Sequence, residues 1–406
     1  MKKFFILIVL CSVLVSLFGC GADHNTPSIP VVENPTITLT TCYAGSEIDI
    51  CTPELREYLN AQTEAEQAAV LLRYSGGNCS YQACQFRWEG DGSETYTVYF
   101  ADNMAFENAT TVTTTNQQLV NYGTFIPGTT YFWKVVGDLE GSNSIIDYFT
   151  IVDAPIRPIE TESILNTRDI GGWKTESGKT VQYGMIYRCA RTNRVGDNQC
   201  ADGDVTLFRD VLGVATEIDL RGADAYKQSM SVFGEDILYV RAPISAYSCI
   251  IPEFAQTEPV YATFDGGTPW SIKSIFEVLG QEENYPVVFH CNAGADRTGT
   301  LAFLINGVLG VSYEDLTRDF EVTSFGGSTR WRSDITDSQT FADYGIQLSD
   351  DSNYIAWDQM YRLMLEHYGT EDGTLKSAIE NYLINACDVA KSDIETLQTI
   401  MLKQGE

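Results

Sequence analysis

Short apolar runs alternate with amphipathic segments along the second half of the chain. The apolar run Val287–Phe289 is followed by a tight loop and then by the apolar positions of Leu301–Leu304, an order that predicts a strand, a loop and a helix. Further strands are predicted at Met185–Ala190, Val214–Arg221 and Leu238–Pro243. Helices are predicted at Asp204–Leu212, Pro269–Leu279, Tyr313–Phe320, Tyr354–His367, Leu375–Leu383 and Ser392–Met401. Such alternation indicates an α/β domain with a central, mostly parallel sheet flanked by helices.

The first part of the chain is dominated by strand patterns. Strands are predicted at Thr36–Thr40, Gln85–Trp88, Tyr96–Phe100, Thr129–Val136 and Ile145–Val152. Tyr131, Trp133 and Val135 share one face of their strand, which resembles the penultimate strand of a fibronectin type III sandwich, with Trp88 as a core partner. We therefore predict a small all-β sandwich.

One segment of this first part has a helical pattern. Thr52 is a good N-cap, Pro53 suits the first helical position, and Glu54 is an acidic residue in the first turn. These signals predict a helix from Thr52 to Leu72, inserted between the strands.

The length of 406 residues favours two domains. The proline-marked segment Asp153–Pro158 is predicted to be the boundary between them. We therefore expect the sandwich at 36–153 and the α/β domain at 154–406.

The N-terminus predicts export. Lys2 and Lys3 precede an apolar run at Phe4–Phe18 that is too short for a comfortable membrane span. Leu17-Phe18-Gly19-Cys20 resembles the lipobox of a bacterial lipoprotein signal, with Phe18 bulkier than usual. The resemblance implies a signal at 1–19, a lipid on Cys20, a tether at 20–35 and a lipid-anchored place in the bacterial cell envelope, periplasmic or surface-exposed. An unlipidated secretory signal is the alternative.

An exported chain with many cysteines predicts disulfides. Of the 11 cysteines, Cys42, Cys51, Cys79 and Cys84 can supply two bridges in the first domain, with three pairings open. A metal site is the less favoured alternative, because no histidine lies near these four.

The formal net charge of −29 argues against nucleic acid and against an anionic membrane surface as partners. The membrane is then reached only through the N-terminal lipid. An anionic substrate must be bound by local geometry rather than by long-range attraction.

The loop after Val287–Phe289 predicts an anion site. It begins at Cys291, contains Gly294, and leads into a helix at Arg297. Backbone amides of such a loop, a helix N-terminus and a guanidinium together suit the oxygens of a phosphate. The same surroundings lower the pKa of a thiol from about 8.5 to roughly 3.5–7.5, which would make Cys291 a nucleophilic thiolate.

The ten residues from His290 to Gly299, HCNAGADRTG, resemble the signature of the cysteine-dependent phosphatases. The form is most like the atypical bacterial tyrosine and lipid phosphatases, whose loop usually reads HCxAGKDRTG; Ala295 stands where that family has lysine. Asn166–Gly172 is similar to the family's NxRDxGG segment, and Ile218–Arg221 to its IDLR segment. Together the similarities span nearly all of 160–404.

The resemblance implies roles for the loop residues. Cys291 is the nucleophile, Arg297 binds phosphate together with the loop amides, and Thr298 donates a hydrogen bond to the leaving sulfur. His290 orients the loop. The phosphate loop consists of Asn292, Ala293, Gly294, Ala295, Asp296 and Arg297. No metal or cofactor is required.

The general acid remains open between two carboxylates. Asp219 is expected at the carboxyl end of its strand, near the loop, and Asp296 lies inside the loop. The alternative for Asp219 is a salt bridge to Arg221 or Arg297.

Several arginines have two interpretations each. We expect Arg168 and Asp169 to form an ion pair that fixes their turn, with a contact to substrate as the alternative. Arg188 and Arg191 either add charge around the phosphate or lie on the surface. Arg330 and Arg332, in an expected cover at Ser324–Leu348, either contact substrate or are solvated.

Three functions compete. The leading one is a phosphate monoester hydrolase, a protein tyrosine phosphatase acting on a phosphorylated protein or a small phosphate monoester. A phosphoinositide or inositol-phosphate phosphatase is the rival, which Ala295 weakens. The third is a catalytically silent, phosphate-binding surface lipoprotein.

Overall fold

The computed structural model describes residues 27, 29–30, 32–120, 124–193, 200–222, 228–252, 267–332 and 352–402. The predicted signal and Cys20 lie outside the described residues, as does 333–348 of the expected cover. Among the described residues, no helix combines the length and the apolar character that a membrane span needs.

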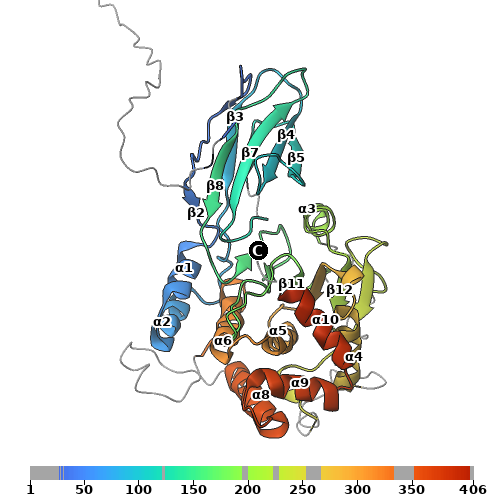
Figure 1. The fold of residues 1–406 in the computed structure, drawn as a ribbon. Helices are drawn as coiled ribbons and strands as arrows, with labels where there is room; N and C mark the ends of the chain where they lie inside the picture. The colour runs from blue at the N-terminus through green and yellow to red at the C-terminus, as the bar shows by residue number, and fades with distance from the viewer. Residues whose placement is uncertain are drawn as a thin grey trace, which may run out of the picture.

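A six-stranded sheet forms the centre of the second half (Figure 1). Its order is β13-β12-β14-β11-β10-β9, and β13, β12, β14 and β11 run parallel whereas β10 and β9 are antiparallel. The strands are β9 Arg157–Pro158, β10 Arg168–Asp169, β11 Ile186–Cys189, β12 Thr216–Asp219, β13 Leu238–Arg241 and β14 Val287–His290. The prediction of a mostly parallel sheet within an α/β fold is confirmed.

Helices surround the sheet at the predicted places. They are α3 Asp202–Thr206, α4 Gly267–Leu279, α5 Asp296–Leu309, α6 Tyr313–Val322, α8 Ser352–Tyr368, α9 Leu375–Asn385 and α10 Lys391–Met401. Short 3-10 turns occur at Tyr247–Ile250, Glu282–Asn284 and Thr323–Phe325. The helix expected at Asp204–Leu212 is instead the short α3 followed by a π-helical turn, Leu207–Val211.

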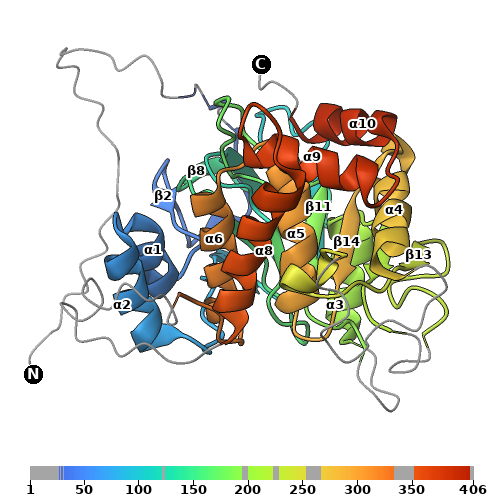
Figure 2. The ribbon, with the colours of Figure 1, turned by 90° about the horizontal axis from the view of Figure 1, so that it is seen from below.

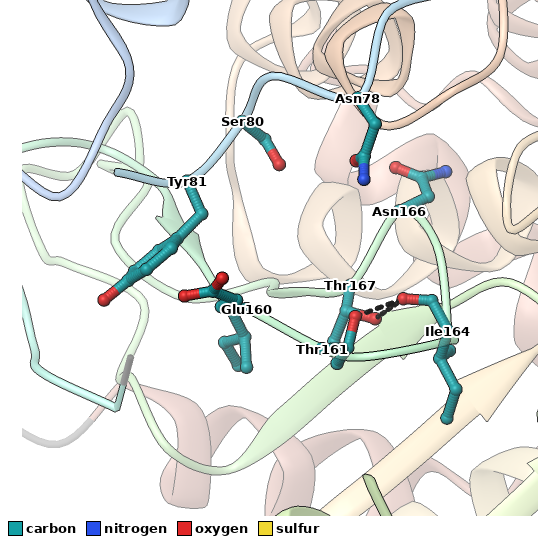
Figure 3. A pocket seen from close by; sticks show the side chains of 9 residues that line it. Asn78, Ser80, Tyr81, Glu160, Thr161, Ile164, Asn166 and Thr167 are labelled. Atoms are coloured by element: carbon teal, nitrogen blue, oxygen red, sulfur yellow. Dashed lines mark hydrogen bonds between the residues drawn. The ribbon is translucent and has the colours of Figure 1, made fainter. Parts of the chain in front are cut away.

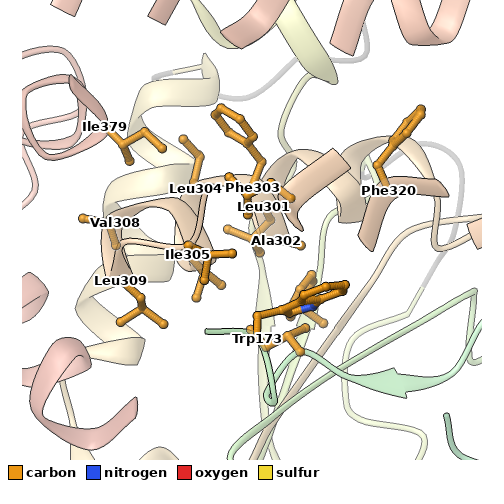
Figure 4. Close-up of a cluster of buried hydrophobic side chains, with 14 of the residues drawn as sticks. Trp173, Leu301, Ala302, Phe303, Leu304, Ile305, Val308, Leu309, Phe320 and Ile379 are labelled. Carbon is orange, nitrogen blue, oxygen red and sulfur yellow. The ribbon is translucent and has the colours of Figure 1, made fainter. Parts of the chain in front are cut away.

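The central helix α5 is buried on all sides. Every residue from Thr298 to Leu309 is buried, and α6, α9 and α10 contact the helix (Figure 2). Leu301, Phe303 and Ile305 lie in one apolar cluster with Trp173 and Phe320 from neighbouring segments (Figure 4). A helix that is apolar all round needs such a position, and this packing fixes the N-terminus of α5 in space.

Strands also dominate the first part of the chain, in two sheets. The three-stranded sheet has the order β1-β3-β6 and the five-stranded sheet the order β2-β8-β7-β4-β5. The strands are β1 Thr38–Leu39, β2 Glu47–Ile48, β3 Gln85–Glu89, β4 Tyr96–Ala101, β5 Thr110–Thr114, β6 Gln118–Val120, β7 Thr130–Gly137 and β8 Asp147–Ile151. Side chains from both sheets share one apolar cluster, in which Trp88 and Trp133 are buried as predicted.

The predicted inserted helix is two helices, α1 Pro53–Asn60 and α2 Glu64–Tyr74. The Thr52 side chain caps α1 as expected. Thr63 starts α2 with a capping box, which explains why one helix becomes two.

These two helices pack against the second half of the chain rather than against the strands around them. Leu55 and Leu71 belong to the apolar cluster that contains α5, not to the cluster of the two β-sheets. The Tyr58 hydroxyl donates to Glu321 on α6 at 2.5 Å, and Arg318 donates to the Leu59 carbonyl at 2.7 Å. By packing, α1 and α2 are part of the α/β half.

The two expected disulfides are not present. Cys42, Cys51, Cys79 and Cys84 are all free thiols. Cys51 lies in the apolar cluster of the α/β half, Cys84 lies in the cluster of the β-sheets, and Cys42 is exposed. The folding of α1 and α2 away from the strands distributes these cysteines over different surroundings.

Candidate active site

The predicted phosphate loop connects the end of β14, at His290, to the start of α5, at Asp296. No side chain caps the N-terminus of α5, so its first amides remain available to an anion. Gly294 has φ +65°, and a Cβ there would lie 2.6 Å from the Cys189 carbonyl carbon. Glycine is therefore required at this turn. Cys291 is the first residue of the loop after β14, and it is 2% exposed.

His290 is held by Glu217, a carboxylate that belongs to none of the sequence motifs. Its Nε2 is 2.9 Å from Glu217 Oε1, and its Nδ1 is 3.4 Å from the Cys291 carbonyl oxygen. Burial raises the pKa of Glu217, but the hydrogen bond and charge of His290 outweigh burial and lower it. The orienting role expected for His290 is consistent with these contacts. The available signal for Glu217 was a second acidic residue, two positions before Asp219, inside the otherwise mostly apolar run Val214–Leu220.

Asp296 lies where the loop joins α5, and both of its carboxylate oxygens accept hydrogen bonds. Tyr247 donates its hydroxyl to Oδ1 at 2.5 Å, and Arg330 donates from Nε to Oδ1 at 2.7 Å and from Nη2 to Oδ2 at 3.1 Å. Burial raises the pKa of Asp296, but the hydrogen bonds and charge of Arg330, with Tyr247, lower it below its ordinary value. Arg330 therefore contacts the loop as well as belonging to the expected cover.

Asp219, the other acid candidate, is an ion-pair partner. It is 1% exposed and accepts from Arg221 through the backbone N at 2.9 Å, Nε at 2.8 Å and Nη2 at 2.7 Å. Tyr239 donates a further bond at 2.9 Å. Burial raises the pKa of Asp219, but the charge of His290 and the bonds from Arg221 lower it to about 2. The salt-bridge alternative describes Asp219. Asp296 is also ion-paired, but its side chain is 32% exposed, whereas that of Asp219 is 1% exposed, so Asp296 is the candidate acid that a substrate can reach.

The expected ion pair between Arg168 and Asp169 is wrong. Neighbouring side chains on a strand point to opposite faces, and these two take different partners. Arg168 Nε contacts Asp319 Oδ1 at 3.0 Å, whereas Asp169 Oδ2 contacts Arg157 at 3.2 Å. Asp319 also accepts from Arg188 at 2.5 Å.

Two buried side chains, Arg188 and Asn166, bind the carbonyl side of the loop. Arg188, fully buried, donates to the Gly294 carbonyl at 2.9 Å, and Asn166 Nδ2 donates to the same carbonyl at 2.8 Å. Loop carbonyls that are bound from outside leave their amides to face inward. Arg188 therefore stabilises the conformation of the loop and does not provide an exposed positive charge at the opening of the phosphate site.

The remaining candidates are placed as follows. Arg297 Nη1 donates to the Leu220 carbonyl at 3.3 Å. Thr298 Oγ1 is buried and has no hydrogen bond within the described residues, so its bond to the Cys291 sulfur is not formed here. Arg191 is exposed, and Arg332 is buried against Glu321, with Nε 2.7 Å from Oε1. Arg332 therefore does not reach substrate.

A polar cavity of about 140 Å³ lies among the side chains drawn in Figure 3. Asn166 lines it and also binds the loop carbonyls, so the cavity and the loop share a wall. The lining residues come from the α2–β3 connection and from the start of the α/β half: Asn78, Ser80, Tyr81, Ile159, Glu160, Thr161, Ile164, Asn166 and Thr167.

Comparison with known proteins shows the family of this chain. Residues 159–403 match the model of the tyrosine phosphatase family, and the chain belongs to that family. A Cupriavidus necator protein, provisionally named a tyrosine-protein phosphatase, is 26% identical over 170 residues, which are 39% of this chain and 60% of that protein. The tyrosine-protein phosphatase of Nostoc commune is 28% identical over 142 residues, 33% of this chain and 47% of that protein. The chain thus spans about half the length of these curated relatives.

Two solved structures have weak similarity. One is the core catalytic domain of the PP-IP phosphatase Siw14 from S. cerevisiae in complex with citrate, with 16% identity, a TM-score of 0.25, and coverage of 43% of this chain and 86% of that one. Another Siw14 catalytic core has 14% identity and a TM-score of 0.24, with coverage of 43% and 86%. At these TM-scores neither structure carries an argument about this chain.

Proposed function

We propose that this chain hydrolyses phosphate monoesters as a protein tyrosine phosphatase, through a cysteinyl-phosphate intermediate. One arrangement carries the proposal: Cys291 lies at the base of a loop that opens onto the uncapped N-terminus of α5, and Asp296 stands on the first turn of that helix. A thiol, an anion-binding loop and a carboxyl at one helix end are the parts that the reaction needs.

The reaction has two steps. The Cys291 sulfur attacks phosphorus, and the S–P bond forms while the bond from phosphorus to the leaving oxygen breaks. Asp296 gives its proton to that oxygen. Water then attacks phosphorus and returns a proton to Asp296, the S–P bond breaks, and phosphate leaves. Arg297 and the loop amides stabilise the equatorial oxygens, and Thr298, whose hydroxyl has no partner within the described residues, supports the sulfur as it leaves.

The test is phosphate release from p-nitrophenyl phosphate by the purified chain under reducing conditions. Wild type should release phosphate, and Cys291→Ser should not, with unchanged circular dichroism and thermal unfolding. Absence of release by well-folded wild type would favour the silent, phosphate-binding alternative.

The substrate class is proposed from the loop. Ala295 is 1% exposed and adds no cation beside the phosphate site, so a head group with several phosphates gains nothing at this position. We therefore expect faster hydrolysis of phosphotyrosine peptides than of phosphoinositides or inositol phosphates. The reverse order of kcat/KM would establish the rival function.

The location and domain organisation are also proposals. Lys2, Lys3 and the apolar run before Cys20 support a lipoprotein signal and a lipid-anchored place in the cell envelope. Incorporation of labelled palmitate, lost in Cys20→Ala, would test the anchor. The shared core of the two β-sheets supports a fibronectin type III-like sandwich before the phosphatase region.

A further inference from the structure

Tyr247 lies outside every motif of the sequence and yet contacts the candidate acid. It begins the 3-10 turn Tyr247–Ile250 and is 5% exposed. Its hydroxyl donates to Asp296 Oδ1 at 2.5 Å, and its backbone N donates to Thr300 Oγ1 at 2.8 Å. Thr300 in turn donates to the Asp296 carbonyl at 3.0 Å. One residue is therefore bound at both ends to the first turns of α5.

The backbone of Tyr247 adopts a conformation that side-chain-bearing residues rarely take. Its φ is +54°, in the left-handed region that favours glycine. Such a conformation persists where the surroundings hold it, and it gathers at functional sites. Here the ring packs edge-on against Phe320 and Trp357 at centroid distances of 6.1 and 6.4 Å. These contacts direct the hydroxyl at Asp296.

Arg330 contacts Asp296 through a side chain on a fixed backbone. The Ser324 hydroxyl accepts from the Arg330 backbone N at 2.9 Å and donates to the Arg330 carbonyl at 2.6 Å. The guanidinium reaches both carboxylate oxygens, at 2.7 and 3.1 Å. Ser324 therefore holds the Arg330 backbone, whereas Asp296 and the Thr329 carbonyl, at 2.5 Å from Nη1, hold its guanidinium.

The two partners of Asp296 differ in what an incoming phosphate does to them. A proton donor needs one carboxyl oxygen that carries the proton, and in this structure Tyr247 and Arg330 occupy both oxygens. A phosphate dianion at the loop competes with the carboxylate for a guanidinium, because both are bidentate acceptors. The Tyr247 hydroxyl has no net charge, so the phosphate does not compete for it in the same way.

We propose that Tyr247 is a positioning residue for Asp296 and that Arg330 exchanges from Asp296 to the bound phosphate, which frees Oδ2 to carry the transferred proton. The inference rests on the proposed function and deepens it. Once Arg330 has moved, Asp296 takes a proton from solvent. It gives that proton to the leaving oxygen as the P–O bond breaks and the S–P bond forms. Tyr247 keeps Oδ1 fixed throughout.

The positioning role is tested by leaving-group dependence in Tyr247→Phe. The p-nitrophenolate of p-nitrophenyl phosphate leaves with little assistance from a general acid. The leaving oxygen of phenyl phosphate needs to be protonated by the acid as it leaves. We expect kcat for phenyl phosphate to fall about 10- to 100-fold, with a few-fold change for p-nitrophenyl phosphate. Asp296→Asn should give the same pattern more strongly.

The control for this variant is Tyr183→Phe. Tyr183 donates its hydroxyl to the Ala154 carbonyl at 2.5 Å, away from the loop, so its loss should affect both substrates equally. An equal decrease for both substrates in Tyr247→Phe would overturn the positioning role. The proposed function would still stand, because wild type would hydrolyse both.

The exchange of Arg330 is tested by binding. Arg330→Gln should raise KM and weaken competitive inhibition by inorganic phosphate about tenfold, and Arg330→Lys should recover part of the loss. Arg362→Gln is the control, since Arg362 is an exposed partner of Asp358 on α8. Unchanged inhibition by phosphate in Arg330→Gln, with lowered thermal stability alone, would show that Arg330 only pairs with Asp296.

Discussion

The packing of α1 against the α/β half predicts that a residue far from the catalytic motifs controls the stability of the phosphatase region. Leu55 is fully buried in the apolar cluster that contains α5. Leu55→Ala removes its side chain from that cluster and leaves a cavity, which costs about 2–5 kcal/mol. For a folding unit of this size, about 1 kcal/mol lowers the unfolding temperature by about 2–4 °C. We therefore expect a decrease of about 4–20 °C.

The assay compares two core variants of the full chain by calorimetry and by thermal inactivation of p-nitrophenyl phosphate hydrolysis. Phe86→Ala is the matched control, because Phe86 is equally buried but lies in the cluster of the β-sheets. Leu55→Ala should lower the inactivation temperature, whereas Phe86→Ala should not. If Leu55→Ala leaves the inactivation temperature unchanged and Phe86→Ala lowers it, α1 is not part of the phosphatase core.

Three further changes test the groups around the loop. Gly294→Ala should abolish phosphate release, since φ +65° and a backbone carbon at 2.6 Å leave no room for Cβ; a fully active variant would show that the loop adapts. Asp319→Asn leaves Arg168 and Arg188 without their carboxylate, and urea unfolding should show a loss of about 3–5 kcal/mol. Asp219 has a pKa lowered to about 2, so its stabilisation, about 2.6 kcal/mol, is present above its unfolded pKa of about 3.9 and is lost as pH falls toward 2. Asp219→Asn should remove that part of the acid dependence, and an unaltered pH profile of unfolding would contradict it.

Local patterns were enough to locate the loop and most elements around it. Val287–Phe289 is apolar because β14 is buried on both faces. The residues that predict the start of α1 at Thr52 all lie within one helical turn of it. Both features depend on neighbours in sequence. For this reason strand β14 and the starts of α1 and α5 were predicted close to their observed positions, whereas the break between α1 and α2 was not predicted.

Contacts between distant residues could not be predicted in the same way. Tyr58 meets Glu321, Arg168 meets Asp319 and Tyr247 meets Asp296 only after the chain has folded. The periodicity of apolar residues along the sequence does not indicate which distant residues will contact one another. The expected pair Arg168–Asp169 was wrong because adjacency in sequence places side chains on opposite faces of a strand.

The proposed mechanism requires that Cys291 carries the phosphate during the reaction. Rapid acid quenching of the full chain with a phosphotyrosine peptide, followed by mass spectrometry of the peptide that contains Cys291, would detect this intermediate. Wild type should carry phosphate covalently bound to Cys291, and Cys291→Ser should carry none. Phosphate release by wild type with no phosphorylated Cys291, matched by release from Cys291→Ser, would contradict the mechanism.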